Sequence, residues 1–219
     1  MNKLKTIIIC ALFGALLIPS VVNGWGVVGI SGGVAAESEY EISDDFSSDT
    51  SADYTQTSEG NQTPTLTVSD GSAHSTSGYS AKYYHKTALS SVNHYAQATC
   101  SAADADYSAI MVRATDDTHY LVYASGTYIK LARVVDGSLT WLANGSGSIS
   151  DTSTHTYKLS VSGTGDTVTI KFYYDGSEWI DYDDTDASRI TTGTHVGPTF
   201  RRETCTTEPT MDNFIGDTL

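Results

Sequence analysis

The sequence predicts an all-β domain, an antiparallel β-sandwich of two stacked sheets. The composition is rich in Ser, Thr, Gly and Tyr, with 14 Tyr against 12 Lys plus Arg, and this usage favours strands and turns over helices. Beyond Ser43, apolar and polar residues alternate almost throughout, as in half-buried antiparallel strands. Asp-Gly pairs stand at 70–71, 136–137 and 175–176. The last two are hairpin signals, since a type I′ turn needs positive φ at both central residues.

Residues 1–36 differ from the rest of the chain and predict a leader for export. Lys3 and Lys5 precede an uncharged segment with the apolar core TIIICALFGALLIPSVV, which is the anatomy of a secretory signal peptide. Small residues favour cleavage after Gly24 or after Ala36. The alternative is an uncleaved anchor, because an apolar block of about 17 residues can span a bilayer. Both interpretations predict a secreted or cell-surface protein that meets a membrane only through this segment.

A linker over 37–43 and a single domain over 44–219 follow the leader. This exported part has two cysteines, Cys100 and Cys205. In an oxidising compartment an even pair favours a disulfide over two free thiols, so a bond between Cys100 and Cys205 is predicted.

The stretch NGWGVVGISGG, residues 23–33, contains two patterns associated with enzymes. One is G-x-G-x-x-G, typical of dinucleotide binding, and the other is G-x-S-x-G, typical of serine hydrolases. Both patterns require a strand before them and a helix after them. Here a polar segment and then antiparallel strands follow, so neither pattern predicts a cofactor or a nucleophile.

The hairpins predict where two of the tryptophans lie. Pairing through Asp136-Gly137 places Trp141 opposite Ala132, and pairing through Asp175-Gly176 places Trp179 opposite Phe172. Both tryptophans are therefore interpreted as structural. In the preceding hairpin a two-residue loop at 117–118 would place Arg113 and Tyr120 on one face of the sheet. Arg113 is either a ligand-binding group or a rim residue whose stem covers apolar surface.

The formal net charge is −14. Such a surface repels phosphate backbones, which argues against a nucleic-acid partner.

Several segments together carry a resemblance to a known fold family. They are DDFSS, AIMVRATDDTHYLVY, LARVVDGSLTWLA, HTYKLSVSGTGDTVTIKFYYDG, DTDASRITTGTHVG and the closing MDNF. In this order they resemble the concanavalin A-like lectin and glucanase jelly rolls, most closely the laminin G-like modules, over residues 44–219. The resemblance implies two stacked antiparallel sheets, one of them concave, with the two chain ends adjacent on the back sheet.

The resemblance also implies a function, because members of this superfamily hold glycans on the concave sheet or in its rim loops. Its laminarinase-type glycosidases carry E-x-D-x-x-E on one strand, and none of the seven Glu here stands in that pattern. The chain is therefore predicted to be a non-catalytic, lectin-like module for an extracellular glycan or a surface glycoconjugate. Two alternatives stay open: a glycan-degrading hydrolase with carboxylates from distant strands, and a structural or adhesive surface protein.

Four residues form the candidate carbohydrate surface. Tyr95 and Gln97 alternate with alanines in HYAQATC and can share an open face with Arg113 and Tyr120. Aromatic rings suit the apolar side of a sugar, and Arg or Gln suits its hydroxyls. Tyr95 has an alternative interpretation as a buried core aromatic.

Two pairs of aspartates offer oxygen ligands for a structural calcium ion, and each pair also has an alternative interpretation. Asp181 and Asp183 in DYDDTDASR offer hard oxygen ligands, although the Gly and the final Glu of an EF-hand loop are missing. The alternative is a solvated acidic turn. The resemblance implies a second site at Asp45 and Asp212, because some family members carry a structural calcium where the chain ends meet. These two residues otherwise serve as turn residues at strand ends.

Overall fold

The computed structural model describes residues 40–57, 65–75, 79–101, 107–124, 128–145, 153–202 and 209–219. All of them belong to the compact unit Glu37–Leu219. The predicted leader and its cleavage sites, like Cys205, lie outside the described residues. No helix in the described ranges is long and apolar enough to cross a membrane.

One of the two sheets, here called the terminal sheet, contains the first and the last described strands. Its order is β13-β12-β11-β6-β15-β4-β3, and β1 also pairs with β15. The strands are β1 (Ile42–Asp44), β3 (Leu66–Ser69), β4 (Ser72–Ser75), β6 (His94–Ser101), β11 (Thr154–Ser162), β12 (Val168–Tyr174), β13 (Ser177–Asp184) and β15 (Met211–Thr218).

The other sheet, here called the opposite sheet, has the order β10-β9-β8-β7-β14-β5-β2. All its strand pairs are antiparallel, as they are in the terminal sheet. The strands are β2 (Tyr54–Gln56), β5 (Tyr79–His85), β7 (Tyr107–Thr115), β8 (Thr118–Ala124), β9 (Ile129–Val135), β10 (Ser138–Asn144) and β14 (His195–Arg202). A short 3₁₀ turn, η1 (Ser51–Asp53), precedes β2.

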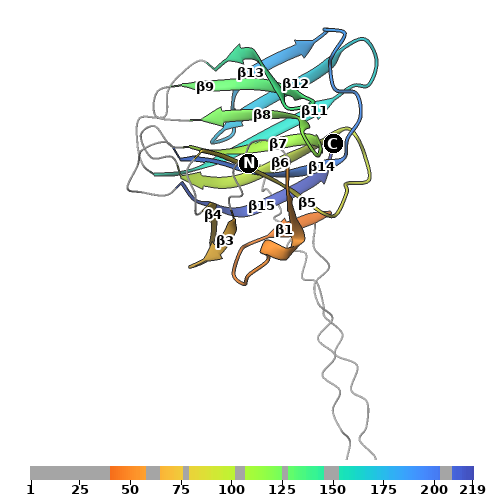
Figure 1. The fold of residues 1–219 in the computed structure, drawn as a ribbon. Helices are drawn as coiled ribbons and strands as arrows, with labels where there is room; N and C mark the ends of the chain where they lie inside the picture. Colours follow the sequence, from red (N-terminus) through yellow and green to blue (C-terminus); the bar gives the residue numbers. More distant parts are fainter. Residues whose placement is uncertain are drawn as a thin grey trace, which may run out of the picture. The chain divides into compact units, whose positions relative to one another are not determined.

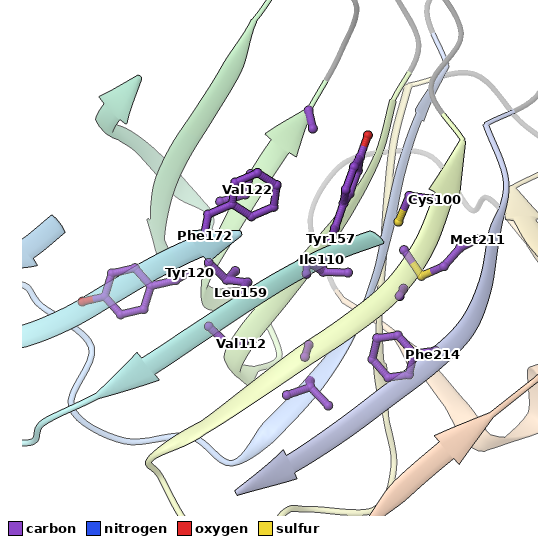
Figure 2. Packing of buried hydrophobic residues seen from close by; sticks show 14 of the residues in the cluster. Cys100, Ile110, Val112, Tyr120, Val122, Tyr157, Leu159, Phe172, Met211 and Phe214 are labelled. Atoms are coloured by element: carbon purple, nitrogen blue, oxygen red, sulfur yellow. The ribbon is translucent and has the colours of Figure 1, made fainter. Parts of the chain in front are cut away.

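The two sheets stack as layers around the larger of two apolar clusters (Figure 1). Figure 2 shows side chains from both layers packed between them. The labelled residues are Cys100, Ile110, Val112, Tyr120, Val122, Tyr157, Leu159, Phe172, Met211 and Phe214. The predicted all-β, antiparallel two-sheet sandwich is therefore confirmed, and its driving force is the burial of alternate side chains from both sheets.

All three Asp-Gly pairs adopt the backbone that the hairpin signal requires. Asp70, Asp136 and Asp175 have φ of 53°, 48° and 47°, and the glycines after them lie between 73° and 77°. Positive φ at both central residues fits a type I′ turn, whose twist matches that of the flanking strands. These turns connect β3 to β4, β9 to β10 and β12 to β13.

The chain ends are adjacent, as the resemblance implies. Asp44 of β1 pairs with Phe214 of β15, so the DDF and DNF segments lie side by side on the terminal sheet. Strand β1 begins at Ile42, inside the stretch that was expected to be a linker.

The β7–β8 hairpin differs from the sequence prediction by one residue. Tyr120 pairs with Val112, and Thr115 pairs with Thr118, so the loop is Asp116-Asp117 instead of 117–118. A bulge between Val112 and Thr115 absorbs the offset, and within it Arg113 has a φ of 51°. A bulge adds a residue to one strand and shifts which side chains face the core.

Trp179 packs on the core as predicted, whereas Trp141 is exposed and not a core residue. Trp141 pairs with Ala132 as predicted, but its side chain is 47% exposed, because β10 is the edge strand of the opposite sheet. Trp179 packs against the core as expected. A bulge in the β12–β13 ladder makes Ile180 the partner of Phe172.

Candidate functional site

Two of the four predicted sugar-binding residues, Arg113 and Tyr120, lie inside the sandwich. Both are 0% exposed, which corrects the expectation that they share an open face with Tyr95 and Gln97. The shifted hairpin is the physical reason. It pairs Tyr120 with Val112, so that both face the core, and it leaves Arg113 in the bulge, where its guanidinium bonds to main-chain carbonyls. Figure 2 shows the ring of Tyr120 between the layers.

Arg113 ties three loop segments together from within. Its guanidinium donates hydrogen bonds to the carbonyl oxygens of Val92 at 3.1 Å, Ile190 at 2.5 Å and Gly163 at 2.6 Å. Burial lowers the pKa of Arg113. The backbone amide of the same residue donates to Nε2 of His94 at 3.1 Å. These contacts make Arg113 part of the scaffold, because all three nitrogens of its guanidinium donate to main-chain carbonyls.

Tyr120 belongs to a buried polar cluster with Arg133 and Asp184, which connects the two sheets. The hydroxyl of Tyr120 donates to Oδ2 of Asp184 at 2.7 Å and accepts the amide of Ile190 at 2.9 Å. Arg133 Nη1 contacts both carboxylate oxygens of Asp184, at 2.9 and 2.8 Å. Burial, followed by the hydrogen bond to Asp184, raises the pKa of Tyr120 above its usual range. We call this group the inner cluster.

Tyr95 and Gln97, the other two predicted residues, lie on the outer face of the terminal sheet. Both are half-buried residues of β6. Tyr95 pairs with Ser160, and Gln97 pairs with Lys158. The ammonium of Lys158 lies 3.7 Å from the centre of the Tyr95 ring. Tyr95 and Gln97 therefore lie on the outer face of the sheet, and Tyr95 is not a core residue.

A groove of about 330 Å³ lies on this outer face beside Tyr95, and we call it the terminal-sheet groove. The cross-strand row Tyr173–Lys158–Gln97 runs through it, because each residue pairs with the next on β12, β11 and β6. Its lining consists of Gln97, Thr156, Lys158, Ser160, Tyr173, Gly176 and Leu219.

The terminal-sheet groove offers both kinds of hydrogen-bonding group. The amide of Gln97 donates and accepts, the ammonium of Lys158 donates, and the hydroxyls of the lining do both. Tyr173 adds a half-buried aromatic side chain to the wall. A cavity with one aromatic side and several convergent polar groups is the usual form of a small-molecule site.

Lys158 and Tyr173 are site residues that the sequence prediction missed. A signal for them was present, because Lys158 and Tyr173 stand at matching positions of the alternating strands on either side of GTGD. Extending that hairpin register to β6 would have placed both beside Gln97.

Acidic residues border this face without entering the groove. On β12, Lys171 donates to Glu178 Oε2 at 3.1 Å and to Asp181 Oδ2 at 2.9 Å. These hydrogen bonds, first that to Asp181, raise the pKa of Lys171. The same ammonium therefore holds two carboxylates of β13.

The four predicted calcium ligands fall into two pairs, Asp181 and Asp183 on β13, and Asp45 and Asp212 in the adjacent DDF and DNF segments. Asp181 contacts Lys171, and Asp183 accepts the hydroxyl of Thr169 at 2.7 Å. Asp45 accepts the amide of Ser47, while Asp212 pairs with Thr99 on β6. Within the described ranges no three His, Cys, Asp or Glu residues group as a metal site.

The predicted Cys100–Cys205 disulfide finds no support in the described residues. Cys100 is a free thiol with 0% exposure, and Cys205 lies outside the described residues. Burial raises the pKa of the Cys100 thiol to about 12. The side chain therefore behaves as a small core residue, packed near Met211 and Tyr157 (Figure 2).

The fold is that of the concanavalin A-like jelly rolls. The carbohydrate-binding module CBM66 from Bacillus subtilis is 15% identical, with a TM-score of 0.60 over 76% of this chain and 96% of that one. A galectin-like protein of unknown function from Bacillus subtilis is 12% identical, with a TM-score of 0.58 over 82% and 96%. A β-1,3-1,4-glucanase (lichenase) from a mouse hindgut metagenome is 11% identical, with a TM-score of 0.53 over 81% and 99%.

These similarities concern the fold, since the identities are low and the named proteins include both a binding module and an enzyme. No protein-family model matches the chain, and no curated protein matches it. The function must therefore be argued from the site.

Proposed function

We propose that the chain is a carbohydrate-binding module that holds an extracellular glycan in the terminal-sheet groove without cleaving it. The observation that carries the proposal is the row Tyr173–Lys158–Gln97, which places an aromatic side chain, an ammonium and an amide along one groove. A sugar presents hydroxyls and one apolar ring face, and this row meets both. The fold shared with a carbohydrate-binding module supports glycan binding in general. The groove itself lies on the sheet that carries the chain ends, which the resemblance implies to be the back sheet and not the concave, glycan-binding one.

Binding without hydrolysis is favoured by the chemistry of the lining. Glycoside hydrolysis uses two carboxyl groups that flank the scissile bond. Among the described residues, no Asp or Glu side chain lines the groove. Glu178 and Asp181 stand on the neighbouring strand, and both are hydrogen-bonded to the ammonium of Lys171.

The test is retention of the full chain on a glycan array, with and without calcium, followed by assay of the retained glycan for released reducing ends. We expect retention in both conditions and no release. Gln97→Ala should weaken binding by about tenfold, because a sugar hydroxyl bound in the groove would lose its hydrogen-bond partner, the Gln97 amide. Gln56→Ala, the same change on β2 of the opposite sheet, is the matched control and should leave retention unchanged.

Three results would contradict the proposal. Retention that Gln97→Ala leaves intact would place the ligand elsewhere. Release of reducing ends that Glu178→Gln or Asp181→Asn abolishes would make the protein a hydrolase. Failure to retain any glycan in either condition would remove the binding function itself.

A further inference from the structure

Strand β10 is an unusually open edge of the opposite sheet. Among the described strands it pairs with β9 alone, so the hydrogen-bonding groups along its other side have no strand partner there. The first four residues, Ser138–Trp141, are all exposed. Leu139 is 42% exposed and Trp141 47%, and they are two of the three large hydrophobic side chains that are exposed in the described ranges.

The other edges carry the protection that β10 lacks. Natural sheets protect an edge with charged side chains or by keeping the edge strand short. The neighbouring edge strand, β13, bears Glu178, Asp181 and Asp183, while β2 and β3 are three and four residues long. By contrast β10 is seven residues long, and its sequence SLTWLAN has no charge.

Charge also selects where two copies of this chain can meet. At a formal net charge of −14, most of one surface repels the same surface of another copy. A neutral strand with two exposed apolar side chains avoids that repulsion and buries apolar area at the same time.

We propose that β10 pairs antiparallel with β10 of a second copy of this chain, about a twofold axis through Thr140. Residues directly opposite in an antiparallel pair share a face of the sheet, so an axis at this residue places Leu139 of each copy opposite Trp141 of the other. Thr140 then meets its own copy on the other face. The bulge after Trp141 ends the regular stretch, so the paired residues coincide with the exposed ones.

The indole of Trp141 is already oriented for this contact. It meets the ring of Tyr123 edge-on at 5.6 Å between centroids, and the ammonium of Lys130 lies 5.1 Å from the ring centre. A side chain held in place loses little conformational entropy on binding. Pairing joins the two opposite sheets into one continuous sheet and leaves both terminal-sheet grooves open, so it does not depend on the glycan proposal.

Sedimentation equilibrium of the full chain tests the proposal. Because the paired stretch is short, we expect a weak, concentration-dependent dimer. Trp141→Lys should raise the dissociation constant by about 30-fold or more, as expected for losing a central aromatic and placing two cations at the edge. Ser177→Lys adds the same charge at an exposed position of β13 and should leave the dimer intact. A chain that stays monomeric throughout, or association that Trp141→Lys leaves unchanged, would overturn the proposal.

Oxidative cross-linking tests the register independently. Thr140→Cys should form a disulfide-linked dimer, because only a residue at the axis meets its own copy. Ser138→Cys should not, because its partner would be Leu142. The parent chain, which contains Cys10, Cys100 and Cys205, gives the background. Equal cross-linking of the two variants would contradict the proposed axis.

Discussion

The inner cluster and the terminal-sheet groove each have a tyrosine and a cation, and they differ in the surroundings of these two groups. Inside, the hydroxyl of Tyr120 and the guanidinium of Arg133 converge on the carboxylate of Asp184 between the sheets. Outside, the ammonium of Lys158 lies over the face of Tyr95. The inner cation has a buried anionic partner, whereas the outer cation has an aromatic ring and faces an open groove.

This difference shows how burial decides what a Tyr–cation pair does. In the interior an unpaired polar atom costs free energy, so each group must be satisfied by the protein and becomes part of the scaffold. On the sheet surface water satisfies the same groups until a ligand replaces it. The contrast predicts large stability effects for changes in the inner cluster and small ones at the groove.

Breaking the inner cluster should give the largest effect. Asp184→Ala leaves the buried guanidinium of Arg133 with only the exposed Asp186, at 3.4 Å, as an anionic partner, which should lower the free energy of unfolding by about 3 kcal/mol. Asp183→Ala, the neighbouring carboxylate that faces solvent, should change it by about 0.5 kcal/mol or less. Urea denaturation followed by circular dichroism measures both. If the two variants lose similar amounts of unfolding free energy, the buried Arg133–Asp184 pair contributes no more to stability than an exposed carboxylate.

Acid should weaken the scaffold through His94, which lies under Arg113. The Nε2 atom of His94 accepts the amide of Arg113, so Nδ1 carries the proton and donates to the carbonyl of Ser91 at 2.9 Å. Burial lowers the pKa of His94 to about 4. An unfolded histidine has a pKa of about 6.5, so the unfolded chain takes up the proton first, and stability falls as the pH drops through this window.

The expected loss from His94 is about 3 kcal/mol between pH 6.5 and pH 4. His94→Gln should remove this part of the pH dependence. His119, whose pKa burial lowers to about 3, should account for much of what is left. Urea unfolding at a series of pH values tests this. If the free energy of unfolding changes with pH equally steeply in the variant and in the parent chain, His94 is not the titrating group.

The sequence was sufficient for the layers and for half of the candidate site. Period-two alternation and the Asp-Gly turns depend only on local chemistry, and the sandwich and the turn conformations followed from them. The position of Arg113 in the β7–β8 hairpin did not follow from them, because the bulge there depends on contacts with residues far away in the sequence. The guanidinium of Arg113 bonds to the carbonyls of Val92, Gly163 and Ile190, which come from three separate segments.

The rest of the groove depended on strand order. The hairpin around GTGD pairs Lys158 with Tyr173, but no local pattern places that pair beside β6. Gln97 and Tyr95 are visible as alternating polar residues, but their neighbours come from β11 and β12, more than fifty residues away in the sequence. The exposure of Trp141 likewise depends on which strand ends the sheet. Local patterns predict which face a residue takes, whereas strand order decides what covers that face.

The smallest effect should come from the outer pair, and a double-mutant cycle measures it. Lys158→Met and Tyr95→Leu keep most of the apolar volume and remove the charge and the ring. Their coupling in urea unfolding should be about 0.5–1 kcal/mol, typical of an exposed cation–π pair. Both single variants should remain folded and yet bind glycan less well, because they alter the polar and aromatic character at the groove. A coupling as large as the effect expected for Asp184→Ala would mean that the outer pair is scaffold too, and that burial does not separate the two regions.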